Sequence, residues 1–249
     1  MDRSTLRADM IDSLEHTLSR PLSASVLSAL RSGPRDEFVP DTPYHNRASE
    51  FEGTRVLAPQ TVVQLLEALD LSAGDSTLIV GSGVGYTAAM IAEIVGETNV
   101  HAIDIDRTLV YAARDNLSRA GYDGVLVDCA DGANGLPQYA PYDRIVIEAA
   151  VLKPPQALLS QLSEHGRIVY PDNPGHPEQS IVAADRSTRN FEQLDTFGTA
   201  QFRPLLVAGE STRGPERNRM HREDAEFATQ GYFAKHGWEQ EWIDWDSHL

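Results

Sequence analysis

Short apolar runs alternate with helix-like stretches through the middle of the chain, and this alternation limits the possible folds more than any other feature. The runs cover residues 77–80, 100–103, 125–127 and 144–147. Stretches with helical spacing begin near Tyr86, Arg107 and Pro155, after the first, second and fourth runs. Strands that alternate with helices form a parallel sheet with helical crossovers. We therefore predict an α/β protein with a Rossmann-like, doubly wound and mostly parallel sheet.

The segment before this region has helical periodicity. Apolar residues four apart in residues 6–18, followed by an apolar group in residues 26–30, predict two short amphipathic helices. These helices should end at Gly33 and Pro34 and form a cap over the core. Apolar positions in residues 62–69 follow the i, i+3, i+4, i+7 pattern and predict a further helix.

The chain after Gly166 is strand-rich up to about residue 207 and then becomes polar. Strand-like runs cover residues 167–170, 180–184 and 201–207. They predict an antiparallel closing edge of the sheet. We therefore expect a Rossmann-like domain with its helical cap in residues 1–207, and a polar linker with an aromatic C-terminal extension in residues 208–249.

All three tryptophans lie in the C-terminal extension. Trp238, Trp242 and Trp245 have helical spacing, with Phe233 nearby. We expect these side chains to dock onto the core, and an exposed stripe that contacts a partner protein is the alternative.

A glycine-rich turn stands between the first apolar run and the helix after it. The segment LIVGSGVGY puts glycines at positions 81, 83 and 85. Glycine permits positive φ angles and has no Cβ, so the backbone can approach a ligand at the helix N-terminus. A dinucleotide site needs G-x-G-x-x-G spacing, but Tyr86 and Thr87 follow Gly85. This difference favours S-adenosylmethionine over NAD as the cofactor.

Two acidic residues follow the next two strand-like runs. Asp104 ends the second run, where a carboxylate can accept hydrogen bonds from both hydroxyls of a ribose. Asp131 lies beyond the third run, where it could bind an adenine amino group beside Gly132, and an ordinary turn is the alternative. The predicted cofactor-binding residues are Gly81, Ser82, Gly83, Gly85, Tyr86, Asp104, Ile105, Asp131 and Gly132.

The charge of the chain is strongly negative. Against 37 acidic residues there are 21 basic ones, which gives a net charge of −16. Such a chain repels itself in dilute buffer, whereas molar salt shortens the Debye length to about 3 Å and removes most of that cost. The acidic residues are spread along the chain rather than gathered in one block. We therefore predict a halophilic protein that binds no nucleic acid.

Other classes of protein are disfavoured by what the sequence lacks. No apolar run approaches the roughly 20 residues that span a bilayer, and the first ten residues do not resemble a signal peptide, so we expect a cytoplasmic protein without a membrane partner. Cys129, which we expect to be half-buried, is the single cysteine. It can form neither a disulfide within the chain nor a thiolate cluster for zinc, and we expect no metal site.

Several collinear segments resemble the protein-L-isoaspartate O-methyltransferase family, up to about Leu206. They are DEFVP, TRVLAPQTVVQLLEAL, VGSGVGYTAA, LPQYAPYDRIVIEAAVLKPPQALLSQLSEHGRIVYP, QSIV and FRPL. The resemblance implies a class I methyltransferase fold and S-adenosylmethionine as the cofactor. It also implies methylation of the abnormal α-carboxylate of isoaspartyl residues, in the repair of damaged cytoplasmic proteins.

The substrate loop departs from the family pattern. The family usually has a serine, then Ala-Pro, then a histidine, and these positions are Leu57, Ala58, Pro59 and Gln60 here. Leu57 cannot donate a hydrogen bond to the incoming carboxylate, so the catalytic residue remains unknown. Gln60, Thr54 and Arg55 are candidates, and a compensating contact from Arg55 is a hypothesis. The resemblance also suggests the small residues Ala149 and Ala150 as part of the substrate site.

The first strand shows a second departure. The family usually has an acid two residues before the first glycine of the turn, where this chain has Ile79. Loss of the acid would lower the affinity for a cationic sulfonium ligand unless another carboxylate, such as Glu148, replaces it.

Three functions are consistent with these features. The first is methylation of isoaspartyl sites, which the collinear resemblance favours. The second is methylation of another acceptor by the same fold, which Leu57 and Gln60 favour. The third is a cofactor-binding adaptor without turnover, which those losses, Ile79 and the aromatic extension favour.

Overall fold

The computed structural model describes residues 2–18, 20–51, 53–173, 176, 178–186 and 191–206. The α-helices are α1 (Arg3–Leu18), α2 (Ala24–Ser32), α3 (Pro59–Leu69), α4 (Tyr86–Val95), α5 (Arg107–Ala120) and α6 (Gln156–Gln161). The strands are β1 (Ser49–Phe51), β2 (Thr54–Val56), β3 (Thr77–Val80), β4 (Val100–Asp104), β5 (Leu126–Cys129), β6 (Tyr142–Ile147), β7 (Leu162–Pro171), β8 (Gln179–Arg186) and β9 (Phe191–Ala200). Short 3₁₀ helices are η1 (Arg35–Glu37), η2 (Glu97–Asn99) and η3 (Pro137–Tyr139).

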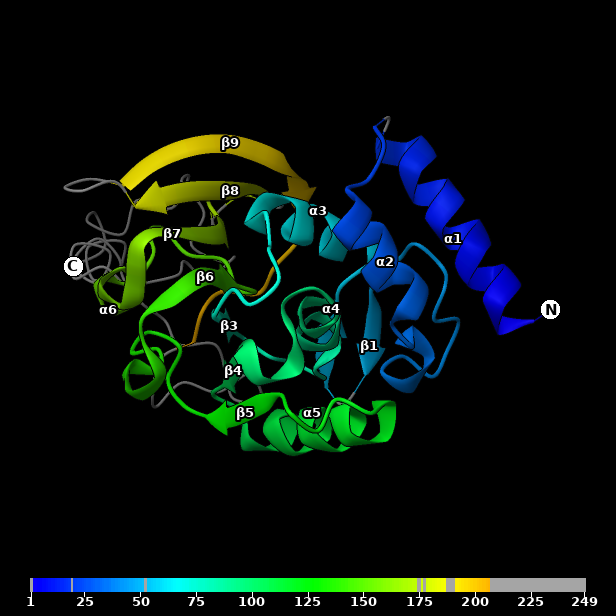
Figure 1. Cartoon of the computed structure of the whole chain (residues 1–249), viewed down its shortest axis with the longest axis horizontal. Helices are drawn as coiled ribbons and strands as arrows, with labels where there is room; N and C mark the ends of the chain where they lie inside the picture. Colours follow the sequence, from blue (N-terminus) through cyan, green and yellow to red (C-terminus); the bar gives the residue numbers. More distant parts are fainter. Residues whose placement is uncertain are drawn as a thin grey trace, which may run out of the picture.

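Seven of the described strands form one sheet in the order β5-β4-β3-β6-β7-β8-β9 (Figure 1). The five strands from β5 to β7 are parallel, and β8 and β9 are antiparallel to their neighbours. The prediction of a mostly parallel sheet with an antiparallel closing edge is confirmed. Because β3 lies between β4 and β6, the strand order reverses beside β3, and such reversals are where open α/β sheets bind ligands.

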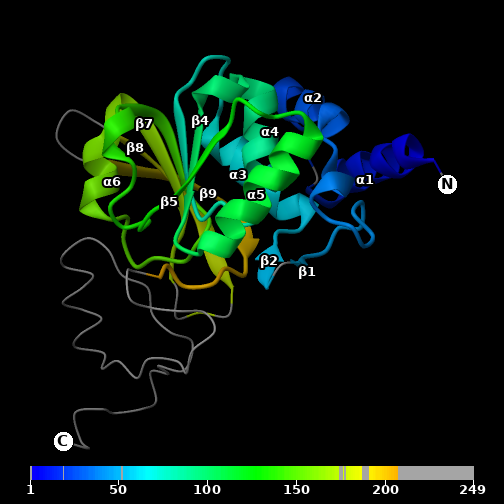
Figure 2. The same cartoon turned by 90° about the horizontal axis from the view of Figure 1, so that it is seen from below.

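Helices cover both faces of the sheet, as a doubly wound fold requires. One face carries Ile79, Ala102 and Val146 and packs against α3, α4 and α5. The other face carries Leu78 and Ile145 and packs against the short helix α6. In Figure 2, α6 lies on one side of the sheet and α3, α4 and α5 lie on the other. The central strands are apolar on both faces because both faces are buried.

The N-terminal helices end where the sequence predicts. The Ser23 hydroxyl caps α2, and the backbone N–H of Gly33 closes its last turn on the Ala29 carbonyl. A Cβ atom at Gly33 would lie 1.7 Å from Met90 Cε of α4, so α2 packs closely on α4. The predicted cap is confirmed, and it covers the outer side of the helical layer.

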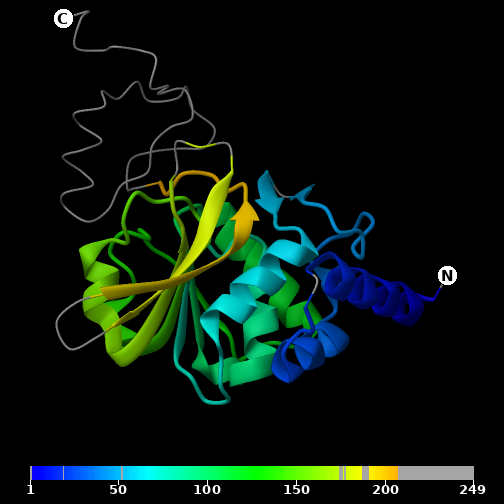
Figure 3. The same cartoon turned by 90° about the horizontal axis from the view of Figure 1, so that it is seen from above.

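The strand predicted at residues 201–207 is wrong. The last strand is β9, and the described residues after it form only a bridge between Pro204 and Ala150. Proline has no backbone N–H to donate to a sheet ladder, so Pro204 interrupts the apolar pattern of this segment. The sequence of β9 is largely polar, and Figure 3 shows this edge strand running past α3. Its polar character explains why apolar patterning missed it.

Three other expectations concern the exposure of Cys129, membrane-spanning helices and the C-terminal extension. Cys129 is exposed rather than half-buried, because it ends the edge strand β5. No helix among the described residues is long and apolar enough to cross a membrane. The extension 208–249, with its three tryptophans, lies outside the described residues.

Candidate functional site

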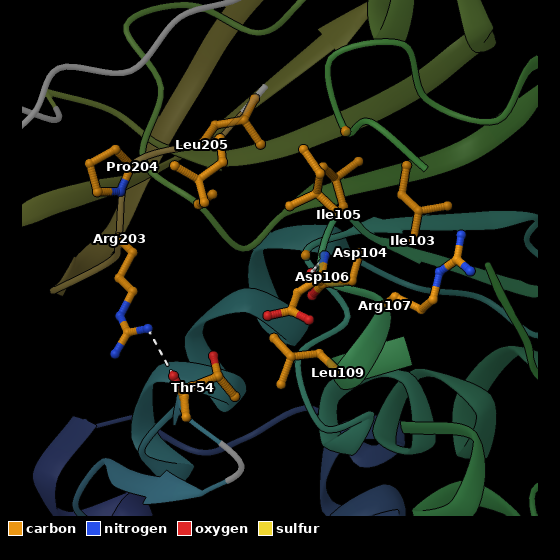
Figure 4. A pocket seen from close by; sticks show the side chains of 16 residues that line it. Thr54, Ile103, Asp104, Ile105, Asp106, Arg107, Leu109, Arg203, Pro204 and Leu205 are labelled. Carbon is orange, nitrogen blue, oxygen red and sulfur yellow. Dashed lines mark hydrogen bonds between the residues drawn. The ribbon is translucent and has the colours of Figure 1, made fainter. Parts of the chain in front are cut away.

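A pocket of about 290 Å³ opens at the carboxyl ends of β3, β4, β5 and β6, where the strand order reverses. Its walls come from the strand ends, the start of α5, the turn between β1 and β2, and the segment after β9 (Figure 4). The lining residues are Gly53, Thr54, Val80, Gly81, Ile103, Asp104, Ile105, Asp106, Arg107, Leu109, Gly132, Ala149, Arg203, Pro204, Leu205 and Leu206. The volume is near the lower end of the range for small-molecule sites.

The glycine turn adopts the backbone that its sequence predicts. Gly81, Gly83 and Gly85 have φ angles of 94°, 50° and 92°, which disfavour any side chain with a Cβ. The backbone N–H groups of Gly81 and Ser82 both donate to the Ile103 carbonyl, at 2.8 and 2.9 Å. The turn is therefore fastened to the end of β4, and Gly81 forms part of the pocket wall.

Asp104 links the turn to the next helix. Its Oδ2 accepts a hydrogen bond from the Gly83 N–H at 2.9 Å, and its Oδ1 accepts one from the Asp106 N–H at 3.0 Å. Burial raises the pKa of the Asp104 carboxyl, although these two hydrogen bonds act to lower it. A carboxylate has about four lone-pair positions, so Asp104 can still accept hydrogen bonds from a ligand in the pocket that it lines.

The other predicted residues of the turn, Ser82, Gly83, Gly85 and Tyr86, do not line the pocket. Ser82 and Tyr86 are buried, and the Tyr86 ring lies 5.7 Å from the Phe38 ring and 4.4 Å from the Arg35 guanidinium carbon. A Cβ atom at Gly85 would lie 3.2 Å from Leu117 Cγ, so this glycine permits close contact of α4 with α5.

Among the remaining cofactor candidates, Ile105 and Gly132 line the pocket. Asp131 does not, and its Oδ1 accepts a hydrogen bond from the Ala133 N–H at 2.9 Å. Its side chain thus stabilises the turn that presents Gly132 to the pocket. A Cβ atom at Gly132 would lie 2.5 Å from Val80 Cγ1, so only glycine fits against β3 at this point.

Glu148 lies beside the glycine turn. Ile79 is paired in register with Val146, and Glu148 stands two residues beyond Val146, so it shares the sheet face of Ile79. Its backbone N–H donates to the Val80 carbonyl at 2.8 Å, whereas its buried Oε1 has no hydrogen-bond partner among the described residues.

Burial raises the pKa of the Glu148 carboxyl to about 8. A hydrogen bond from Thr87 acts to lower it, and the Asp104 carboxylate acts to raise it. The sheet face that lacks an acid at position 79 has one at Glu148, directly after the neighbouring strand β6.

The altered substrate loop points largely away from the pocket. Leu57 is buried, and its carbonyl accepts a hydrogen bond from Arg35 Nη2 at 2.7 Å. Gln60 exchanges two hydrogen bonds with Asn46, at 3.0 and 3.1 Å. Between them, Ala58 and Pro59 form the start of α3.

The other substrate candidates divide between the pocket and its surroundings. Arg55 is exposed and donates to Gln201 Oε1 at 3.0 Å, outside the pocket wall. Thr54 and Ala149 line the pocket, and Ala150 is buried behind it.

The predicted site residues omit several that the structure brings to the pocket. Asp106, Arg107 and Leu109 begin α5, and a helix start after Asp104 could have indicated them. Arg203 lies in the FRPL segment, far along the chain, and no local pattern indicates it. Within the described residues, no group of three His, Cys, Asp or Glu side chains is arranged to hold a metal ion.

The fold and the pocket define the class of the protein. A Rossmann-like sheet whose last strands turn antiparallel is the fold of class I methyltransferases. The family model described as protein-L-isoaspartate(D-aspartate) O-methyltransferase matches residues 7–208. The chain belongs to this family.

Relatives with the same family name cover most of the chain. A protein-L-isoaspartate O-methyltransferase from Methanothermobacter thermautotrophicus is 34% identical, over 74% of this chain and 88% of the relative. Protein-L-isoaspartate O-methyltransferase 2 from Archaeoglobus fulgidus is 36% identical, over 82% of this chain and 94% of the relative.

Solved structures show the same fold. One protein-L-isoaspartate O-methyltransferase aligns with a TM-score of 0.69 at 24% identity, over 82% of this chain and 66% of the other. A protein from Plasmodium falciparum described as a protein-L-isoaspartate O-methyltransferase was solved in complex with S-adenosyl-L-homocysteine. It aligns with a TM-score of 0.67 at 18% identity, over 79% of this chain and 98% of the other.

Proposed function

We propose that this chain transfers a methyl group from S-adenosylmethionine to the free α-carboxylate of L-isoaspartyl residues in damaged proteins. The observation that carries the proposal is the family match over residues 7–208, which includes every residue that lines the pocket. The wild-type chain is then a protein-repair enzyme that acts on isoaspartyl proteins and peptides.

The pocket residues fit this cofactor. Asp104 lines the pocket, and its carboxylate is the kind of acceptor that ribose hydroxyls need. Ile105 and Leu109 add apolar surface for an adenine ring, beside the backbone of Gly132. The glycine turn at Gly81 allows a ligand to approach the backbone at the start of α4.

The chemistry requires positioning more than proton transfer. S-adenosylmethionine supplies, when bound, a methyl group activated by a sulfonium. The acceptor carboxylate is ionised at neutral pH, with a usual pKa near 4, so no general base has to remove a proton. The residues of the chain therefore have to bind the acceptor, orient one of its oxygens and exclude water.

A pair of peptides tests this proposal. Labelled S-adenosylmethionine is incubated in molar KCl with an isoaspartyl peptide and with its aspartyl twin of identical sequence. We expect label transfer to the isoaspartyl peptide alone, as a base-labile methyl ester. Equal transfer to both peptides, or to neither, contradicts the proposal.

A different acceptor is the second candidate, because Leu57 is buried and Gln60 is bonded to Asn46. Neither residue lines the pocket. Transfer to other components of a cell extract, without transfer to the isoaspartyl peptide, would favour this candidate. Cofactor binding without any transfer would favour the adaptor.

We also propose that the protein works in a salt-rich cytoplasm, on the basis of its net charge of −16. Residues 208–249 are proposed as an extension of the catalytic domain in residues 1–207 that contacts partners. Because all three tryptophans lie in that extension, intrinsic fluorescence reports whether it responds to cofactor or peptide. An unchanged emission spectrum with both ligands would contradict a role for it at the site.

A further inference from the structure

The pocket needs a group that receives a carboxylate, and the substrate loop does not supply one. Leu57 is apolar and buried. Gln60, whose Oε1 accepts a hydrogen bond from Asn46, and Arg55, which donates to Gln201, both lie outside the pocket wall. A donor for the acceptor must therefore come from another element that borders the pocket.

Arg203 is placed to be that donor. It follows β9 and borders the pocket together with Thr54. In Figure 4, Arg203 extends toward Thr54 on one side of the pocket, while Asp104 and Asp106 lie on the other side. A carboxylate is attracted to Arg203 and repelled by the two acids, beside which Arg107 also borders the pocket.

The backbone of Arg203 is fixed in place. Its carbonyl accepts a hydrogen bond from the Ala150 N–H at 2.8 Å, and the Leu205 N–H donates to the Ala150 carbonyl at 3.1 Å. Pro204 and Ala150 form a parallel bridge between these two bonds. The segment is thus fastened to the loop after β6, and Ala149 of that loop lines the same pocket.

The side chain, by contrast, has partners that it can exchange. Its Nη1 donates to the Gly53 carbonyl at 3.2 Å, and its Nη2 lies 3.4 Å from Glu50 Oε2. The side chains of Arg203 and Glu50 are 48% and 67% exposed. An ion pair this exposed contributes little stability, so a carboxylate entering the pocket can replace Glu50 at low cost.

We propose that Arg203, beside the Thr54 hydroxyl, is the subsite that binds the carboxylate of the methyl acceptor. The guanidinium holds one carboxylate oxygen and leaves the other free to react. This role rests on the proposed function. It makes Arg203 the group that recognises the abnormal carboxylate, because the substrate loop has Leu57 where the family usually has a serine.

Four variants and two peptides test the subsite, and one of the variants, Arg55→Ala, tests the alternative donor. Arg203→Ala removes the cation, and Arg203→Lys retains it without the planar fork. Arg3→Ala is the control, because Arg3 of α1 is an exposed arginine that pairs with an acid, Asp36, and does not line the pocket. The isoaspartyl peptide is compared with an otherwise identical peptide whose α-carboxylate is a carboxamide. Peptide affinity is measured by fluorescence anisotropy at fixed salt, cofactor affinity by calorimetry, and folding by the unfolding temperature.

We expect the wild type and Arg3→Ala to bind the acid peptide about 30-fold more tightly than the amide, the usual value of a charge-assisted hydrogen bond. Arg203→Ala should bind both peptides equally weakly, and Arg203→Lys should restore part of the preference. The value of kcat/KM for the acid peptide should fall by a similar factor in Arg203→Ala, mainly through KM. Cofactor affinity and the unfolding temperature should not change.

The outcomes separate this subsite from the proposed function. If Arg203→Ala keeps the wild-type preference for the acid peptide, the subsite is wrong and the methylation can still stand. If Arg55→Ala loses the preference instead, the earlier hypothesis of an Arg55 contact replaces it. If the wild type neither methylates the acid peptide nor prefers it to the amide, the function and the subsite are both overturned.

Discussion

Glu148 provides a sharp test of the electrostatics beside the glycine turn. Burial raises the pKa of its carboxyl from 4.5 to about 8, and its buried Oε1 has no hydrogen-bond partner among the described residues. In the unfolded chain the same carboxyl titrates near its ordinary pKa. Between these two pKa values, the folded state binds a proton that the unfolded state has released, so the free energy of unfolding falls as the pH rises.

The size of the effect follows from the two pKa values. The slope is about 1.4 kcal/mol per pH unit between pH 4.5 and pH 8, and the total loss is about 5 kcal/mol. Below pH 4.5 the carboxyl is protonated in both states and the effect vanishes. Glu148→Gln removes the titration and keeps the size and shape of the side chain.

Urea denaturation of both proteins at pH 5 and at pH 8.5, at equal salt, measures this difference. We expect nearly equal free energies of unfolding at pH 5, and a variant more stable than the wild type by several kcal/mol at pH 8.5. Glu164→Gln, at an exposed position, is the control and should show no such change between the two pH values. If the free energies of unfolding of Glu148→Gln and the wild type differ by the same amount at both pH values, the raised pKa of Glu148 is refuted.

The same variant tests whether Glu148 replaces the acid that Ile79 lacks. Weaker binding of S-adenosylmethionine by Glu148→Gln above pH 8, measured by calorimetry, would support that role. Because the variant is expected to be more stable there, weaker binding could not be attributed to unfolding. Equal affinity would leave the buried carboxyl without a part in cofactor binding.

Asp104→Asn should weaken S-adenosylmethionine binding about tenfold or more in calorimetry, because it removes a charged acceptor, and unaltered affinity would contradict a ribose contact. Gly85→Ala should lower the free energy of unfolding by about 1–3 kcal/mol in urea denaturation, because φ is 92° and Cβ would lie 3.2 Å from Leu117. Gly74→Ala is its control, since φ is 87° and no atom lies within 4 Å, so a similar loss there would assign the cost to the backbone alone. The unfolding temperature should rise steeply between low-salt buffer and molar KCl, and an equal temperature in both would remove the basis for a halophilic protein.

The parts of the fold that depend on local pattern could be predicted from the sequence. The strand at residues 77–80 has the predicted bounds, and the helices begin at Tyr86 and Arg107 as expected. The sequence predicts that Gly83 and Asp104 belong to one site, because each lies near the carboxyl end of a parallel strand. In the structure the two residues share a hydrogen bond. Apolar periodicity and strand ends are encoded within a few residues, so these features needed no knowledge of distant contacts.

The parts of the site that depend on distant contacts could not be predicted. Arg203 reaches the pocket only because its segment pairs with Ala150, and Glu148 meets the turn only because β6 lies beside β3. Gln60 was a candidate on its chemistry, but Asn46, fourteen residues earlier, holds it elsewhere. Tyr86 belongs to the motif in sequence, yet the helix turns its ring toward Phe38. Each of these positions depends on which elements become neighbours.

The bridge between Ala150 and Pro204 also bears on the order in which the protein becomes active during its synthesis. One wall of the pocket is built from residues 203–206, which follow all seven strands of the sheet in the sequence. A ribosome adds those residues after the seven strands, so a nascent chain that has emerged only as far as Ala200 has the sheet without this wall of the pocket. A nonsense codon just after β9 would thus yield a protein that can fold its sheet and lacks Arg203 altogether.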